Sequence, residues 1–220
     1  MELTVGQVLA EVNRSLKMAG FPAISYTEVP HAAPAQKRHA AAMLHEALHL
    51  RGEADGSWDT ALALRDLHEC HACVRHVAQV YAKGIMEATK DGIFGMRGSV
   101  TAEDTTRWIA RLADPALRLT PKPCQAALPQ RVTFAAAAEL LAKMPRRVLL
   151  DLRDEELSAA EPFSPEHRRL PYPRLHQNPY QAAEDPDMPI FLYCRSGYLA
   201  VLAAGELTKA GFRQVFAVVP

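Results

Sequence analysis

Cys194 combines the residue type and the surroundings of a nucleophile. It follows an apolar run at 190–193 that predicts a buried strand, and apolar residues recur at helical spacing from Leu199 to Leu207. Gly211 stands where the C-terminus of this helix is expected. Because ligands of open parallel sheets bind beyond the carboxyl ends of the strands, the order strand, loop, helix predicts that the thiol lies at such a crevice.

The residues after Cys194 predict that its thiol is reactive. The first turn of the following helix supplies unpaired backbone N–H groups and the positive end of the helix dipole, which both favour a thiolate. Arg195 adds a positive charge next to the sulfur. The alternative is a buried structural cysteine that happens to end a strand, since free cysteine is among the most buried residue types.

A second predicted strand ends in an acid and a base. The apolar residues 148–150 predict a buried strand, and Asp151 and Arg153 follow it. The proline-containing residues 162–189 predict a long irregular connection, and residues 213–219 predict a last strand. Strands that alternate with helices are typical of a parallel α/β domain.

Three motifs occur in order in residues 146–220. They are LLDLR at 149–153, D-x-P-I-x-x-Y-C-R-S-G-Y at 187–198, and A-G-F-R-x-V at 210–215. Together they closely resemble the rhodanese family of sulfurtransferases, which implies an α/β fold with a parallel sheet flanked by helices. The resemblance also implies that the loop cysteine takes a sulfane sulfur from a small donor such as thiosulfate. It then becomes a persulfide and passes the sulfur to a thiol or cyanide acceptor.

The resemblance assigns roles to individual residues and implies no cofactor. Cys194 would be the nucleophile. Asp151 and Arg153 would brace the loop by hydrogen bonds, and a simple salt bridge between them is the alternative. Backbone amides of the loop would cradle the bound sulfur, with Gly197 allowing the tight curl. The implied cradle consists of Arg195, Ser196, Gly197, Tyr198 and Leu199.

Several residues depart from the family pattern. Leu199 stands where active members commonly have arginine, serine or threonine, and HRRLPYPRLHQNP at 167–179 replaces the family's H-x-x-G-A-x-N segment. Charged residues of that replacement are candidates for restoring the positive charge: His167, Arg168 and Arg169. Ala200 stands where related phosphatases carry a phosphate-binding arginine, which disfavours phosphate transfer. The expected domain also ends earlier than the family pattern, so a degenerate, non-catalytic module is the alternative function.

The first half of the chain is helical in pattern. Thr4 is a predicted N-cap, and Thr101 opens a capping-box pattern. Residues 113–131 contain four prolines and predict an extended crossing before the boundary between residues 1–145 and 146–220. Apolar stripes and helix-stop signals predict helices at 5–16, 36–50, 67–83, 101–112 and 133–144.

Part of this helical pattern repeats. An apolar residue, a threonine and an amphipathic helix recur from residues 3, 99 and 131. The longest match, residues 64–112, includes Asp66, His71 and Tyr81. These stretches resemble the S-layer homology repeats of bacterial surface proteins, which implies a mainly α-helical, degenerate three-fold domain over 1–145 and a cell-wall polymer as its partner. Family members bind that polymer largely through a basic residue after the threonine, but the residues here are Val5, Ala102 and Phe134. An unrelated helical domain is the alternative.

Two clusters of metal-ligand residue types occur in this half. The first contains His68, Cys70, His71, Cys73 and His76. Residues three apart share a helix face, so Cys70 with Cys73, or Cys73 with His76, supplies half of a zinc site. The second is HExxH at 45–49, a helical zinc-protease pattern for which the sequence marks no third ligand. Solvated histidines on helix faces are the preferred interpretation, so no metal is predicted.

Composition narrows the classes of partner. Lys plus Arg equals Asp plus Glu at 25 each, which gives no global field that would recruit nucleic acid or an anionic membrane. No window approaches the ~20 apolar residues of a membrane span, and the first residues lack a signal-peptide pattern. Four cysteines are too few for a disulfide framework, so a reducing compartment is the default expectation. The S-layer resemblance instead favours the cell surface, and it makes a non-catalytic cell-envelope anchor the alternative function.

Overall fold

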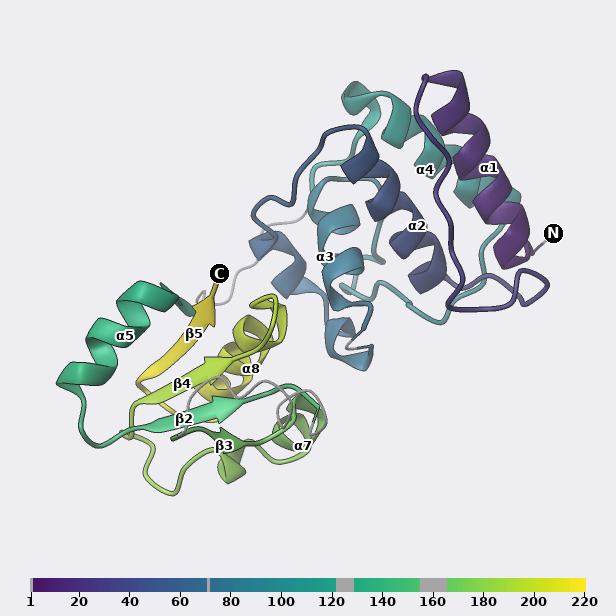
Figure 1. Ribbon diagram of the computed structural model, residues 1–220. Coiled ribbons are helices and arrows are strands. Elements are labelled where there is room, and N and C mark those ends of the chain that lie inside the picture. Colours follow the sequence, from purple (N-terminus) through teal and green to yellow (C-terminus); the bar gives the residue numbers. More distant parts are fainter. Residues whose placement is uncertain (1, 71, 122–128, 155–165) are drawn as a thin grey trace. The chain divides into compact units, whose positions relative to one another are not determined.

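The chain forms two compact units. The parts that the computed structural model describes are residues 2–70, 72–121, 129–154 and 166–220. Contacts between residues divide the chain into Met1–Ala126 and Ala127–Pro220 (Figure 1). This division falls before the boundary predicted at residue 145. Residues 130–143, expected in the helical first half, therefore belong to the second unit.

The described part of the first unit is built from helices. Its α-helices are α1 (Val5–Met18), α2 (Lys37–Leu50), α3 (Val74–Ala82) and α4 (Ala102–Ala113). Its 3-10 helices are η1 (Asp59–Ala63), η2 (Leu67–Glu69) and η3 (Pro115–Leu117). The helices predicted at 5–16, 36–50 and 101–112 are confirmed. The helix predicted from residue 67 begins only at Val74, because the extended backbone of Cys70 separates η2 from α3.

Within the described residues of this unit, a closed ring of backbone hydrogen bonds joins three helix starts. The N–H of Leu3 donates to the carbonyl oxygen of Val100 at 2.8 Å. Val100 donates in the same way to Ala35 at 3.2 Å, and Ala35 donates to Leu3 at 2.8 Å. Each residue directly precedes the N-cap of α1, α2 or α4. The helix starts are therefore related by an approximate three-fold arrangement, in which Ala35 takes the place that the repeat pattern assigns to Val132.

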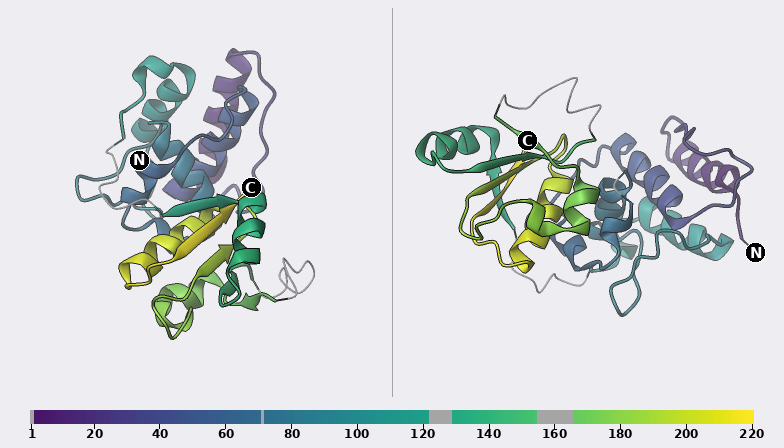
Figure 2. Two further views of the ribbon diagram at one scale, coloured as in Figure 1. Left: turned by 90° about the vertical axis from the view of Figure 1, so that its left-hand side faces the viewer. Right: turned by 90° about the horizontal axis from the view of Figure 1, so that it is seen from below.

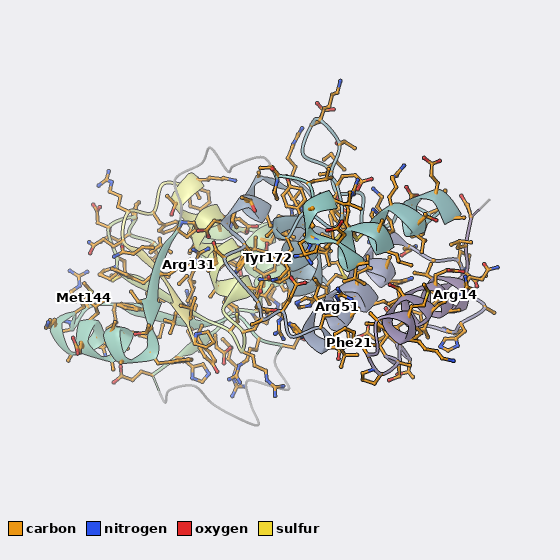
Figure 3. The ribbon with its side chains drawn as sticks, turned by 90° about the horizontal axis from the view of Figure 1, so that it is seen from above. Arg14, Phe21, Arg51, Arg131, Met144 and Tyr172 are labelled. Atoms are coloured by element: carbon orange, nitrogen blue, oxygen red, sulfur yellow. A yellow bond between two sulfur atoms is a disulfide. The ribbon has the colours of Figure 1, made fainter. Side chains whose placement is uncertain are left out.

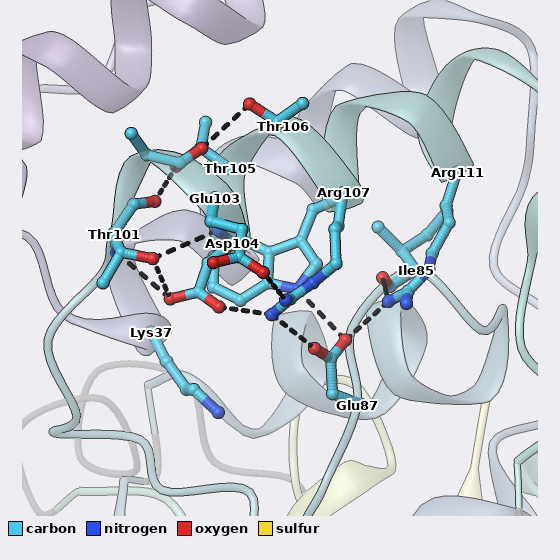
Figure 4. A network of polar contacts seen from close by, with 12 residues as sticks. Lys37, Ile85, Glu87, Thr101, Glu103, Asp104, Thr105, Thr106, Arg107 and Arg111 are labelled. Atoms are coloured by element: carbon cyan, nitrogen blue, oxygen red, sulfur yellow. Dashed lines mark hydrogen bonds and ion pairs between the residues drawn. The ribbon is translucent and has the colours of Figure 1, made fainter.

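A partly buried polar network attaches α4 to the segment that follows α3 (Figure 4). The Glu87 carboxylate accepts hydrogen bonds from Arg111 at 2.5 Å, and from Arg107 and the Trp108 indole N–H at 3.2 Å each. Because its indole N–H has a partner, Trp108 packs in the core without an unsatisfied donor. Thr101 caps the start of the same helix, where the predicted capping box with Asp104 is confirmed.

Two arginines fix the loop that follows α2. The guanidinium carbon of Arg51 lies 5.4 Å from the ring centroid of Phe21 (Figure 3). The two terminal nitrogens of Arg118 donate to the two carboxylate oxygens of Glu53 at 2.8 and 2.5 Å. These hydrogen bonds lower the pKa of Glu53. The loop is thereby held at residues just before Asp55, a residue of the cluster described below.

The second unit is an α/β domain, as predicted. Its described strands form one parallel sheet in the order β1-β5-β4-β2-β3. The strands are β1 (Gln130–Thr133), β2 (Val148–Asp151), β3 (Arg168–Arg169), β4 (Ile190–Tyr193) and β5 (Val215–Val219). The helices are α5 (Phe134–Lys143), α7 (Tyr172–Gln177), α8 (Tyr198–Lys209) and the 3-10 helix η4 (Pro179–Gln181). The sequence did not predict β1, β3 or α7.

Helices cover both faces of this sheet (Figure 2). The face toward α5 is lined by aromatic and aliphatic side chains in register, and the rings of Phe191 and Phe216 stack with centroids 4.7 Å apart. Helices α7 and α8 lie on the other face (Figures 1 and 2), where the Tyr172 hydroxyl donates to Glu206 at 2.6 Å. Strand residues alternate between the faces, so the continuous apolar runs of β2, β4 and β5 follow from burial on both sides.

Strand β1 explains why the unit begins before residue 145. Its Val132 pairs with Val218 of β5, and Thr133 then caps α5 by accepting from the Ala136 N–H. The strand and the helix therefore form one connected element of the sheet domain. Among all described residues, no helix combines the length and the apolar character needed to traverse a lipid bilayer.

Candidate functional site

The backbone around Cys194 follows the predicted order. Strand β4 ends at Tyr193, Cys194 comes next, and Gly197 is the N-cap of α8. Gly197 has a φ of +80°, and a Cβ added there would lie 3.0 Å from Cγ1 of Val219. Glycine is therefore required twice over, by the left-handed backbone and by the close approach of β5. The loop can curl over the sulfur only because this residue has no side chain.

Backbone N–H groups converge on the sulfur of Cys194. The N–H of Ala200 donates to Sγ at 3.4 Å. Burial raises the pKa of the thiol above its ordinary value, since the residue is only 2 % exposed. Hydrogen bonds from the backbone oppose this shift in pKa, in the order Ala200, Ser196, Leu199 and Gly197. The predicted acidic thiol is therefore wrong in net direction, because burial outweighs the amides that act as predicted.

The observed cradle overlaps the predicted one and extends it. Ser196, Gly197 and Leu199 of the predicted set act on the sulfur through their amides, and Ala200 joins them. Ala200 is the third residue of α8, so its N–H has no partner within the helix. That general rule about first-turn amides could have identified it from the sequence. The Arg195 side chain, expected next to the sulfur, is exposed to solvent.

Asp151 and Arg153 form a buried ion pair beside this loop. Arg153 donates through Nε to Oδ1 of Asp151 at 3.0 Å and through a terminal nitrogen to Oδ2 at 2.7 Å. Its guanidinium carbon lies 5.0 Å from the ring centroid of Tyr193, the residue before Cys194. Asp151 and Tyr193 are also partners across β2 and β4. The interpretation as a salt bridge is therefore confirmed, and bracing of the loop by hydrogen bonds stays a prediction.

The segment that replaces the family pattern lies partly at the same place. His167 Nε2 is 3.9 Å from Oδ2 of Asp151. Arg168 and Arg169 form β3 and are exposed, and the Arg168 guanidinium donates to the carbonyl oxygens of Gln181 and Ala182. Three residues were candidates for restoring the positive charge. Of these, His167 lies beside the Asp151 carboxylate.

A hollow of about 700 Å³ in the second unit does not belong to the Cys194 loop. Its lining includes Arg147, Val148 and Met188, at the amino ends of β2 and β4. Cys194 follows the opposite, carboxyl end of β4. Ligands of parallel α/β sheets are expected at that carboxyl end. This hollow and Cys194 therefore lie at opposite ends of the strands of the sheet.

The structure rearranges the first candidate metal cluster. Cys70 and Cys73 form a disulfide, so their sulfurs are not available as zinc ligands in this state. The same bond departs from the predicted reduced cysteines. His68 lies in η2, and His71 lies outside the described residues. His76 lies in α3, where it contacts His45 instead of the cysteines, with 2.9 Å between their Nδ1 atoms.

The second candidate cluster gains the ligand type that the sequence did not mark. His45 and His49 of α2 both hydrogen-bond to Oδ1 of Asp55, in the loop after that helix. Burial lowers the pKa of His45 to about 4, against the opposing effect of its hydrogen bond with Asp55. Asp55 was missed because it follows α2 in a polar loop, where nothing in the spacing reveals which way the chain turns.

Comparison with known protein families gives no match to this chain, and comparison with curated proteins gives no significant relative. Two places in the chain bring chemically active residues together. They are the Cys194 loop of the second unit and the histidine cluster of the first.

Proposed function

We propose that the second unit is a rhodanese-like sulfurtransferase domain in which Cys194 forms a persulfide. The observation that carries the proposal is the convergence of backbone N–H groups on Sγ, led by Ala200 at 3.4 Å. Fixed N–H dipoles stabilise negative charge without any rearrangement of side chains. A persulfide bears its negative charge on the outer sulfur, which the same loop would enclose. The motifs at 149–153, 187–198 and 210–215 support the same function.

The proposed reaction has two displacements at sulfur. Cys194 releases its proton to solvent, and the thiolate attacks the outer sulfur of a donor such as thiosulfate. The S–S bond of the donor breaks, and sulfite leaves with the electron pair of that bond. A thiolate or cyanide then attacks the outer sulfur of the persulfide and regenerates the Cys194 thiolate. Neither displacement needs an added oxidant or reductant.

The burial of Cys194 favours a second candidate, a module that does not turn over. With 2 % of the residue exposed, a donor reaches the sulfur only when the loop opens. The raised pKa also leaves little thiolate at neutral pH. A degenerate rhodanese-like module that serves in protein interaction would have the same burial. Turnover distinguishes the two candidates.

The test is mass spectrometry of the full chain after treatment with thiosulfate. The proposal predicts a gain of about 32 Da, one sulfur, on the peptide that contains Cys194. Cys194→Ser should abolish both this gain and thiocyanate formation from cyanide. Cys70→Ser/Cys73→Ser, which leaves the loop intact, should retain both. A persulfide without thiocyanate would favour a sulfur carrier, and no persulfide on Cys194 would overturn the catalytic function.

For the first unit, the function best supported is an S-layer-homology-like domain that binds a cell-wall polymer. The ring through Leu3, Ala35 and Val100 supports it, because this ring relates three helix starts. The ring also identifies α2, instead of α5, as the third of these helices, so the residue that follows the third N-cap is a different one. The third such residue is Lys37, not Phe134, so one of the three positions is basic.

Retention on purified cell walls tests this second function. The full chain should be retained through its first unit. Lys37→Ala should weaken retention because the basic residue is lost. Lys17→Ala, which removes an exposed lysine at the other end of a helix, is the matched control. Absence of retention of the unaltered chain would remove the cell-wall function and leave the sulfurtransferase proposal untouched.

A further inference from the structure

We propose that His45, His49 and Asp55 bind a divalent metal ion of the Zn²⁺ class. Nε2 of His45 lies 2.8 Å from Oδ1 of Asp55, and Nε2 of His49 lies 2.7 Å from the same oxygen. One ligand atom from each residue lies within 4.8 Å of the other two. Two ring nitrogens thus already converge on one carboxylate oxygen.

The backbone holds these three residues together before any ion arrives. His45 and His49 are one turn apart on α2, and their ring centroids are 4.3 Å apart. The loop that carries Asp55 is attached to α3 by a two-way amide contact. Gly56 donates to the side-chain oxygen of Gln79 at 3.1 Å, and the Gln79 side-chain nitrogen donates back at 2.9 Å. Such preorganisation is what a metal site requires of its supporting residues.

Two residues of α3 orient the ligands. Nδ1 of His76 lies 2.9 Å from Nδ1 of His45. When Nε2 of His45 coordinates a metal, its proton resides on Nδ1, from which it donates to His76. Arg75 donates through Nε to Oδ2 of Asp55 at 2.8 Å, so Oδ1 is the oxygen turned toward the histidines. His76 and Arg75 are positioning residues in this site.

The donor set selects the class of ion. Two imidazoles and a carboxylate are ligands that Zn²⁺ accepts, whereas Mg²⁺ and Ca²⁺ prefer oxygen ligands alone. With Zn–N and Zn–O bonds near 2.0–2.1 Å, ligand atoms of a tetrahedral site are about 3.3 Å apart. The carboxylate of Asp55 would therefore move away from the two nitrogens by roughly half an ångström, and the two imidazole rings would adjust around the ion. The side chains of His49 and Asp55 are 32 % and 24 % exposed, so water can supply a fourth ligand.

The site is proposed to bind a metal, not to cleave peptides. In the HExxH protease pattern, the glutamate acts as the base beside the metal. Here Glu46 is exposed, whereas His45 is 1 % exposed. The carboxylate that contacts both histidines is instead that of Asp55. The site is also distinct from Cys70 and Cys73, which are joined to each other.

The experiment uses the full chain without a histidine tag, first treated with a chelator and then titrated with Co²⁺ and Zn²⁺. One Co²⁺ per chain should bind and give the intense visible absorption of four-coordinate Co²⁺, and Zn²⁺ should displace it. Asp55→Asn and His49→Gln should weaken affinity by more than about 100-fold. His76→Gln should weaken it by about 10–100-fold, the range for a residue that orients a ligand. His76→Gln should also shift the Co²⁺ spectrum without loss of stoichiometry.

Three control variants should bind like the unaltered chain. Glu46→Gln tests the protease pattern, His31→Gln removes a histidine outside the cluster, and Cys70→Ser/Cys73→Ser removes the neighbouring cysteines. Circular dichroism confirms that each variant is folded. If Asp55→Asn does not fold, His49→Gln decides, because the partly exposed side chain of His49 is replaceable. Substoichiometric binding by the unaltered chain, unchanged affinity in the ligand variants, or loss of binding in the cysteine variant would each overturn the proposal.

Discussion

The Cys194 loop and the cluster of His45, His49 and Asp55 differ in which atoms build the site. Around Cys194, neighbouring residues of one loop supply backbone N–H groups. In the cluster, side chains from α2 and from the following loop supply the contacts. A site made of backbone atoms tolerates changes of side chain but not of backbone conformation. A site made of side chains is lost when any one of its residues is replaced.

The largest expected effect is the loss of stability when the buried ion pair beside the Cys194 loop is broken. Asp151→Asn removes one charge of a buried ion pair and leaves Arg153 without its carboxylate, which should cost about 3–5 kcal/mol of unfolding free energy. Denaturation followed by circular dichroism and hydrogen exchange of β4 peptides measures this effect. Asp187→Asn breaks the exposed pair with Arg213 and should cost about 1 kcal/mol or less. Equal effects of the two variants would show that the buried pair does not support the loop.

The next effect concerns backbone conformation. Gly197→Ala introduces a Cβ at a φ of +80° and 3.0 Å from Val219, so it should destabilise the second unit by about 2 kcal/mol and reduce persulfide yield. Gly205→Ala lies within α8 and should instead be neutral or stabilising by up to about 1 kcal/mol. Thermal unfolding and the thiosulfate reaction measure both variants. Normal persulfide formation by Gly197→Ala would contradict a cradle made of backbone atoms.

The third prediction is the pH dependence of Cys194. Burial raises its pKa, so its thiolate fraction should rise about tenfold per pH unit across neutral pH and keep rising beyond the ordinary pKa of a cysteine. The alkylation rate by iodoacetamide should follow that fraction. Free cysteine, measured beside the protein, should reach its plateau at lower pH. A plateau for Cys194 at acidic or neutral pH would mean that the amides outweigh burial.

The smallest effect compares a helix cap with an ordinary surface position in the first unit. Thr101→Ala removes the side chain that accepts from the Asp104 N–H, which should cost about 1 kcal/mol. Thr106→Ala, at an exposed position of the same helix, should change stability by less than about 0.5 kcal/mol. Both tryptophans, Trp58 and Trp108, lie in the first unit, so their fluorescence reports its unfolding. Similar stabilities of the two variants would show that the Thr101 cap does not stabilise the first unit.

Local patterns were sufficient where a structural element is determined by neighbouring residues. The strand, loop and helix around Cys194 were predictable because the apolar run, the glycine and the helical spacing are contiguous. Strand β1 was not, since its four residues form a strand only by pairing with β5, which lies far along the chain. The helical pattern after Thr133 instead suggested a further repeat of the first unit.

Tertiary contacts account for the rest of what the sequence did not reveal. Ala35 was missed as a repeat start because the next residue is Gln36, whereas the other starts have threonine. Asp55 became a ligand candidate only through the path of its loop. The raised pKa of Cys194 also depends on packing, because the degree to which the sulfur is buried in the folded chain is not visible in the loop sequence.

The most direct test of the central claim is the mass of the peptide containing Cys194 after thiosulfate treatment of the full chain. The account predicts a gain of about 32 Da on that residue and its removal by cyanide. An unmodified Cys194 in folded protein, when the Cys194 thiol of an untreated sample is alkylated by iodoacetamide, would contradict it.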